Sequence, residues 1–308
     1  AIQDNNETLP VRKICDYGDK PYGKAIVFPR QQLAPAWFRK TFSFDQDITR
    51  ARLYICALGY GKPQINGREV SNVQLSPAQT DYEDHAMYDC HDVTSLLKSV
   101  KNMLSVLLDP GWFDQVGGFG AIMSYGRPGM KALLRLDYEN GQTEFVKSDS
   151  SWQFKESRLQ AANTYLGERF NYRIDDEGWN NTIDGSNWNA VQELEPLSPE
   201  LIPNDIPPMR KLREIKPVKK WKVGKKTWLF DLGENITGWI KLAFNEPAGN
   251  VIRIRYSEMA ENGKIWNTPL SHWWCHGTAQ RDEIICDRNA KVYETQFAFK
   301  GFRYFEVS

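Results

Sequence analysis

The loop DPGWFDQVGGFG at residues 109–120 combines aromatic rings, carboxylates and glycines, which are residue types that bind sugars. An indole has a flat apolar face that stacks on a pyranose ring. Loops at the rim of a rigid scaffold commonly carry binding residues, and glycines let such a loop expose a ring. Trp112 and Phe113 are therefore candidate sugar contacts. The alternative is that Trp112 closes the end of its own β-sandwich.

A second group of amide and charged side chains lies in a loop-rich segment, and it comprises Asn163, Glu168, Asn171, Arg173 and Asp176. Asn163, Glu168 and Arg173 are candidate sugar contacts. Ca²⁺ takes six to eight oxygen ligands, which such a loop can supply. The calcium candidates are Asp109, Glu168 and Asp176. Two alternatives stay open: a solvated loop, or an internal Glu168–Arg173 pair that fixes the loop.

The His/Cys cluster of the chain is His272, Cys275 and His276. On a helix the two histidines would share a face, as metal ligands can. The neighbouring Trp273, Trp274 and Gly277 favour a loop, so we predict no metal site there. Four histidines in the whole chain leave little material for a nucleophile–base pair.

Composition excludes several classes of partner. The chain has 39 basic and 39 acidic residues, so it lacks the charge excess that binds nucleic acid or an anionic membrane. The basic run 211–226 is broken by Glu214 and Pro217 and is interpreted as a solvated linker face. No apolar stretch approaches the ~20 residues of a membrane helix. The five cysteines show no Cys-x-x-Cys spacing, and Cys56 and Cys90 are interpreted as small buried hydrophobes.

The elements that must position these residues are predicted to be strands. Three Asn-Gly pairs, at 66–67, 140–141 and 262–263, stand between strand-like runs and suit hairpin turns. Around the first pair, ARLYICALGYGKPQINGREV is predicted to form a hairpin. Asp92 or Thr94 is expected to cap a short helix that begins at Ser95. With little helical periodicity elsewhere, the sequence predicts an all-β protein of sandwich or jelly-roll type.

A chain of 308 residues suggests two domains. The clearest boundary is PLSPELIPNDIPPMRKLREIKP (196–217), whose six prolines cannot donate to a sheet and stiffen the chain. We predict two β-sandwiches in tandem, with the first opening on WFRKTFSF (37–44) as an edge strand. The predicted divisions are a lead segment at 1–35, a jelly-roll carbohydrate-binding-like module at 36–195, a Pro-rich linker at 196–218 and a concanavalin-like sandwich at 219–308.

Several motifs resemble those of one glycosidase family, in its order and spacing. They are ALGYGKPQINGREV, DYEDHAMYDCHDVTSLLK, DPGWF, SDSSWQ and GERFNYR followed by EGW, and then FDLGENITGWIKL, PAGNVIRIRYSEM and FAFKGFRYFEVS. The chain is similar to the N-terminal β region of bacterial α-L-rhamnosidases of glycoside hydrolase family 78. Gly61-Lys62-Pro63 departs from the family pattern, and HWWCHG (272–277) matches no signature of the family.

The resemblance implies a parent enzyme that cleaves terminal α-L-rhamnosides by inversion, with two carboxylates across a water. In that family the two carboxylates belong to an (α/α)6 barrel that follows the β domains. We therefore expect no catalytic residue in this chain and no hydrolysis by it alone, but a support for the barrel. Some similar modules bind rhamnose through calcium, so a rhamnose-containing glycan is the expected partner, with no cofactor or with calcium. The alternatives are a free-standing carbohydrate-binding protein and a structural scaffold without a ligand.

Location is left undetermined by the sequence. The polar opening AIQDNNETLP carries no signal peptide and is interpreted as a mature or trimmed start. Secretion or a periplasmic location is consistent with the use of polysaccharides, although no residue demands it.

Overall fold

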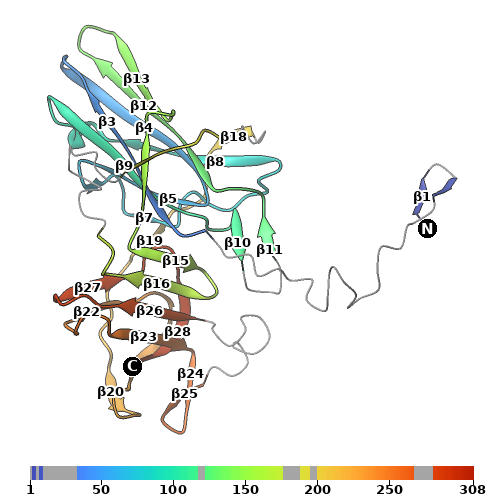
Figure 1. The fold of residues 1–308 in the computed structure, drawn as a ribbon, viewed down its shortest axis with the longest axis vertical. Coiled ribbons are helices and arrows are strands. Elements are labelled where there is room, and N and C mark those ends of the chain that lie inside the picture. Colours follow the sequence, from blue (N-terminus) through green and yellow to red (C-terminus); the bar gives the residue numbers. More distant parts are fainter. Residues whose placement is uncertain are drawn as a thin grey trace. The chain divides into compact units, whose positions relative to one another are not determined.

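The structure is a computed structural model, and it describes residues 2–4, 7–9, 33–116, 122–175, 188–194, 200–266 and 280–308. The chain divides into two compact units, residues 1–31 and 32–308. In the first unit, β1 (Ile2–Asp4) and β2 (Glu7–Leu9) form an antiparallel hairpin. The described part of the second unit is built from strands and one short 3₁₀ helix (Figure 1), which confirms the predicted all-β class with two sandwiches.

The first sandwich packs a five-stranded sheet on a six-stranded sheet. The five-stranded sheet has the order β13 (Thr143–Lys147), β12 (Gly129–Tyr138), β4 (Ile48–Leu58), β8 (His85–Asp92) and β18 (Glu200–Pro203). The six-stranded sheet has the order β17 (Asn189–Ala190), β14 (Gln153–Glu156), β3 (Ala36–Ser43), β9 (Lys101–Asp109), β5 (Tyr60–Ile65) and β6 (Arg68–Glu69).

Side chains alternate between the two faces of each strand, and the inward-facing ones form the core between these sheets. Leu53 and Ile55 of β4 face inward from one sheet, and Leu104 and Val106 of β9 face inward from the other. All four are at most 3% exposed. Burying an aliphatic side chain of this size stabilises the fold by roughly 1.5–3 kcal/mol, so the two apolar faces hold the sheets together.

The Asn66-Gly67 pair forms the predicted tight turn, with φ of 52° and 78°. The turn joins β5 to β6, with Ile65 opposite Arg68. LYICAL is not an arm of this hairpin, contrary to the prediction, because β4 lies in the opposite sheet. The chain changes sheets at Gly59, whose φ is 119°. A Cβ there would lie 2.0 Å from the carbonyl oxygen of Asp109, so only glycine fits.

Replacing Gly59 by Ala is expected to lower the free energy of unfolding by about 2–3 kcal/mol, because it adds backbone strain to a clash with main chain. Gly141→Ala is the matched control. Gly141 also has a positive φ, 81°, but a Cβ there would meet nothing within 4 Å. Urea unfolding of both variants tests whether close packing requires glycine at position 59. Equal losses of stability in the two variants would show that it does not.

The second sandwich is centred on a seven-stranded sheet. Its order is β15 (Leu159–Asn163), β16 (Gly167–Asn171), β26 (Arg281–Ile285), β23 (Val251–Ser257), β28 (Lys300–Val307), β21 (Trp228–Gly238) and β20 (Lys219–Lys222). Apolar side chains of β22 (Lys241–Phe244) and β27 (Lys291–Glu294) join its core, including Leu242 and Tyr293. The hairpin of β24 (Met259–Glu261) and β25 (Lys264–Trp266) turns at Asn262-Gly263, as predicted.

Two segments pair with sheets that the predicted divisions did not assign to them. The hairpin β15–β16 follows β14 of the first sandwich, yet β16 pairs in parallel with β26 of the second sheet. In the Pro-rich segment, β18 pairs in parallel with β8, and β19 (Met209–Arg210) pairs with β7 (Val73–Gln74). The domain boundaries at residues 195 and 218 stay a prediction. In these pairings, strands that the prediction assigned to different divisions are hydrogen-bonded to one another.

Three local predictions are corrected. The strand β3 is not an edge strand, because β14 and β9 pair with its two sides. Cys90 is exposed, whereas Cys56 is buried as predicted, and burial raises the pKa of the Cys56 thiol to about 11. The short helix is 3₁₀ and spans Thr94–Leu96; the Asp92 carboxylate accepts a hydrogen bond from the Thr94 backbone N–H at 3.0 Å. None of the helices among the described residues is long and apolar enough to cross a membrane.

Candidate functional site

The β15–β16 hairpin carries a charged side chain into the second sandwich. Glu168 of β16 is 2% exposed. Its carboxylate accepts hydrogen bonds from the backbone N–H of Gln296 at 2.8 Å and of Phe297 at 2.5 Å, and from the Tyr293 hydroxyl at 3.2 Å. Gln296 and Phe297 lie between β27 and β28. Glu168 therefore fastens the hairpin to the closing strands of the second sheet.

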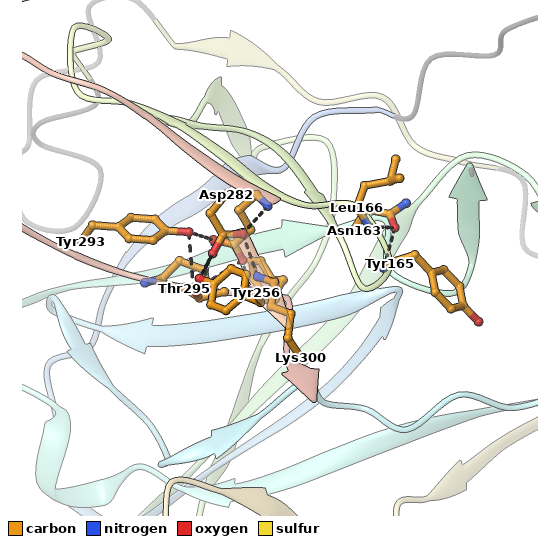
Figure 2. Close-up of polar contacts among 11 residues, drawn as sticks. Asn163, Tyr165, Leu166, Tyr256, Asp282, Tyr293, Thr295 and Lys300 are labelled. Atoms are coloured by element: carbon orange, nitrogen blue, oxygen red, sulfur yellow. Dashed lines mark hydrogen bonds and ion pairs between the residues drawn. The ribbon is translucent and has the colours of Figure 1, made fainter. Parts of the chain in front are cut away.

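Asp282 of β26 is the centre of this buried group, which Figure 2 shows with Tyr256, Tyr293, Thr295 and Lys300. Its carboxylate accepts hydrogen bonds from the Tyr256 hydroxyl and from the Glu168 backbone N–H, the latter at 2.9 Å. The Lys300 ammonium lies 2.7 Å from the same carboxylate, and both side chains are fully buried. We call Glu168, Tyr256, Asp282, Tyr293 and Lys300 the buried polar centre.

The buried polar centre holds two carboxyl groups and the Lys300 ammonium, and the Lys62 ammonium of the first sandwich is close enough to interact with Glu168. Burial and then the nearby Asp282 carboxylate raise the pKa of Glu168 to about 7, although Lys300 and the two backbone N–H groups act in the opposite direction. Glu168 consequently keeps its proton to a higher pH than an ordinary carboxyl group. Since it lies inside the protein and bonds to main chain, this arrangement suits structural support rather than contact with an outside ligand.

Asn163, at the end of β15, links the hairpin to the rim loop. Its side-chain oxygen accepts hydrogen bonds from the backbone N–H of Tyr165 at 2.8 Å and of Leu166 at 3.1 Å, contacts that Figure 2 includes. It also accepts one from the Gln115 amide at 3.0 Å. Asn163 is buried, so its amide oxygen orders the turn between β15 and β16 and ties it to β10 (Asp114–Val116).

The two aromatic candidates of the rim loop lie in different surroundings. Phe113 is fully buried, with the Tyr82 ring 5.1 Å away and the Tyr125 ring 5.8 Å away. Trp112 is only partly buried; its indole is hydrogen-bonded to Tyr60 and meets the Tyr165 ring edge-on at 5.7 Å. Of the two rings, only that of Trp112 retains surface on which a sugar could stack.

Two of the three calcium candidates, Asp109 and Glu168, lie in the described part of the chain, and the Glu168 charge, after burial, contributes to the raised pKa of Asp109. Asp109 is buried, and one of its oxygens accepts a hydrogen bond from the Gly111 backbone N–H at 2.8 Å. Its other oxygen has no hydrogen-bond partner there. No group of three or more His, Cys, Asp or Glu side chains among the described residues could hold a metal ion. Asp176, like His272, Cys275 and His276, lies outside the described residues.

The remaining candidate, Arg173, is exposed, and its backbone N–H donates to the Asn171 side chain at 3.1 Å. Glu168 bonds to main chain and to Tyr293 instead of forming the internal pair with Arg173. Sequence reasoning missed Tyr256, Asp282 and Lys300. The sequence did indicate that Asp282 is buried, because strand alternation places it on the same face as the buried Ile284.

The two sandwiches share a packed interface next to this site. Trp37, Tyr60 and Leu107 lie on the outer face of the six-stranded sheet and pack with Leu159 and Phe297. The Tyr60 and Phe297 rings stack at 6.3 Å with an interplanar angle of 8°. The Lys62 ammonium donates to the Gln296 side chain at 3.1 Å, and burial lowers the pKa of that ammonium. Stacked rings and a buried polar contact hold the two sandwiches together.

Comparison with known proteins shows which family has this arrangement of domains. The α-L-rhamnosidase N-terminal domain matches residues 46–213, and the bacterial α-L-rhamnosidase concanavalin-like domain matches residues 221–308. An α-L-rhamnosidase of Formosa agariphila is 29% identical over 283 residues, which are 89% of this chain and 30% of that protein. One of Streptomyces avermitilis is 31% identical over 265 residues, 85% of this chain and 25% of that protein.

Solved structures agree with this result. The Streptomyces avermitilis α-L-rhamnosidase complexed with L-rhamnose has a TM-score of 0.87 at 30% identity, over 95% of this chain and 28% of that one. The native enzyme of Aspergillus terreus has a TM-score of 0.83 at 29% identity, over 90% of this chain and 32% of that one. The chain thus spans less than a third of the length of these relatives. With both domain matches in the expected order, the chain belongs to the bacterial α-L-rhamnosidase family.

Proposed function

We propose that this chain is the non-catalytic N-terminal β region of an α-L-rhamnosidase and that it supports the catalytic domain of the parent enzyme. The parent hydrolyses terminal α-L-rhamnosides by inversion, with its acid and base in an (α/α)6 barrel. The observation that carries the proposal is the match to two successive β domains of the family over less than a third of the relatives' length. The packed interface between the sandwiches suits a rigid support.

The isolated chain is expected to release no nitrophenol from an aryl α-L-rhamnoside, because inversion needs two carboxylates that straddle the scissile bond with room for a water. In the described part of the chain, Glu168 and Asp282 are both buried and bonded within the sandwich. The full-length α-L-rhamnosidase of Streptomyces avermitilis is the positive control. Measurable turnover by the 308-residue chain would contradict the proposal.

We also propose that Trp112 contacts a sugar at the rim of the first sandwich, with Asn163 and the β15–β16 turn ordering the loop behind it. L-Rhamnose is the probe, since it is bound in the Streptomyces avermitilis relative. Calorimetric titrations with and without calcium test both the sugar and the ion. No heat in either condition would remove this part of the proposal.

Trp112→Ala is expected to abolish the rhamnose signal and to lower the melting temperature far less than Phe113→Ala does. The neighbouring Phe113 is fully buried, and removing such a ring costs about 3–5 kcal/mol of unfolding free energy. Thermal melts beside the titrations separate the two roles. If Trp112→Ala destabilises the chain as much as Phe113→Ala, the indole is part of the core and not a sugar contact.

A structural scaffold without any sugar ligand is the second candidate function. One observation favours it over a free-standing binding protein. Large apolar side chains are exposed on the described part of the second sandwich, among them Val292 at 56%, Met259 at 56% and Trp266 at 39%. Exposed apolar surface of this kind is common where another domain packs.

A further inference from the structure

The hairpin formed by β20 and the start of β21 has an unusual composition. Residues 219–228 read KKWKVGKKTW, which is five lysines and two tryptophans with no acidic residue. The whole chain, by contrast, has no net charge. The sequence predicted a solvated linker face here, but the structure places Lys219–Lys222 in a strand at the edge of the seven-stranded sheet. A concentrated positive charge is therefore held on a defined hairpin.

The pairing of the two strands places lysines around an exposed indole. Lys222 lies opposite Trp228, and Lys220 lies opposite Phe230. Directly opposed residues of an antiparallel pair project from the same face of the sheet, so Lys220, Lys222 and Trp228 share one face. The Lys220 ammonium is 5.7 Å from the centre of the Trp228 ring, which is 41% exposed. The face combines a flat apolar ring with two lysine ammonium groups.

Lys219 lies opposite Asp231 in the strand pair and, after Arg303, helps to lower the pKa of that carboxyl group, but among the described residues no carboxylate lies within ion-pair distance of the hairpin lysines. None of the five forms an ion pair with any residue that the structure describes. Nearby acidic groups are engaged elsewhere: Asp231 binds Arg303 at 2.8 Å, and Glu306 binds Arg255 at 3.3 Å. The hairpin consequently retains its positive charge for an external anion.

We propose that this hairpin binds a sulfated polysaccharide, with Trp228 stacked on the apolar face of a sugar ring and Lys220 and Lys222 paired with sulfate groups. Lysine-rich segments are typical of sites for such polyanions. Lys220 and Lys222 are two residues apart on a strand, about 6.7 Å, so their two ammonium groups can pair with separate sulfate groups of one polymer. The proposal goes beyond the support function and does not depend on the rim loop, because Lys220, Lys222 and Trp228 belong to the second sandwich.

Edge protection and nucleic-acid binding are the two alternative roles for these lysines. Lysines on an edge strand prevent sheet-to-sheet association, and that role needs no ligand. A nucleic acid is also a polyanion, but the balanced charge of the whole chain does not favour it. The exposed indole between the two cations is the feature that favours a glycan over both.

The test uses the 308-residue chain with dextran sulfate, neutral dextran, polygalacturonate and single-stranded DNA at low salt, followed by calorimetry and tryptophan fluorescence. The variants are Lys220→Gln/Lys222→Gln and Trp228→Phe. The matched control is Lys98→Gln/Lys101→Gln, which removes two exposed lysines from the first sandwich. Circular dichroism melts and gel filtration show whether each variant folds and stays monodisperse.

Dextran sulfate is expected to bind and neutral dextran is not. Lys220→Gln/Lys222→Gln should weaken binding about tenfold, the effect of two exposed ion pairs at low salt, whereas the control leaves it unchanged. Trp228→Phe should weaken binding about threefold and remove the change in fluorescence. Equal affinity for DNA or polygalacturonate, an unaffected Trp228→Phe variant, or an equal loss in the control would overturn the proposal. Unchanged affinity with self-association of the lysine variant would instead establish edge protection.

Discussion

Replacing Lys300 by Met is expected to lower the free energy of unfolding by about 3–5 kcal/mol, because it leaves a buried carboxylate without its cation. The Lys300 ammonium is 2.7 Å from the Asp282 carboxylate, and both side chains have no exposed surface. Methionine nearly matches the length of the lysine chain, so the variant tests charge more than packing. Urea unfolding, followed by tryptophan fluorescence, gives the change.

Two further variants make this measurement specific. Lys241→Met is the matched control, since Lys241 pairs with Glu214 at 3.3 Å with half of its side chain exposed. An exposed pair contributes about 1 kcal/mol or less. Asp282→Asn in the Lys300→Met background should recover part of the loss, because it removes the uncompensated charge. A loss no larger than that of Lys241→Met would show that Lys300 does not stabilise the buried polar centre.

Local sequence signals were sufficient for the strands and for several turns. Asn66-Gly67 and Asn262-Gly263 adopt the positive φ values that tight hairpin turns need. Alternation in β4 placed Leu53 and Ile55 inward, as the all-β prediction requires. These patterns involve residues that are adjacent in sequence, so they predict strands and turns without any knowledge of tertiary contacts.

Strand partners could not be predicted in the same way. The β15–β16 hairpin follows the first sandwich in sequence, and nothing in its alternation specifies parallel pairing with β26, more than a hundred residues away. This one pairing changed the interpretation of Glu168. As part of a loop it would have been a solvated ligand for a sugar or for calcium. In the sheet it is buried and accepts hydrogen bonds from Gln296 and Phe297.

The stability of the chain is expected to fall between about pH 5 and pH 8 through the ionisation of Glu168. Its pKa is raised from the ordinary 4.5 to about 7, chiefly by burial and then by Asp282. A group that binds its proton more tightly when folded stabilises the native state fully below its unfolded pKa, and this contribution is lost as pH rises through the folded pKa. The difference in pKa corresponds to a contribution on the order of 3 kcal/mol.

Other titrating groups also change the stability in this range of pH. The contribution of Glu168 must therefore be obtained as a difference between the wild type and a variant that lacks its carboxyl group. Burial also raises the pKa of Asp109, which acts in the same direction, whereas burial lowers the pKa of His91, which acts in the opposite one. Asp231 has a lowered pKa because of Arg303 and titrates at a more acid pH, outside this window. Glu168→Gln removes the titrating group and retains an oxygen that accepts from the Phe297 backbone N–H.

Urea unfolding of the wild type and of Glu168→Gln at half-unit steps of pH isolates the contribution of Glu168. The unfolding free energy of the wild type minus that of Glu168→Gln should decrease as pH rises. Lys300 interacts with both carboxyl groups and Lys62 also interacts with Glu168, so ionisation of Glu168 at high pH places a second negative charge beside Asp282 despite these cations. Parallel curves would mean that Glu168 is already ionised at pH 5, with the backbone N–H groups outweighing the cost of burial.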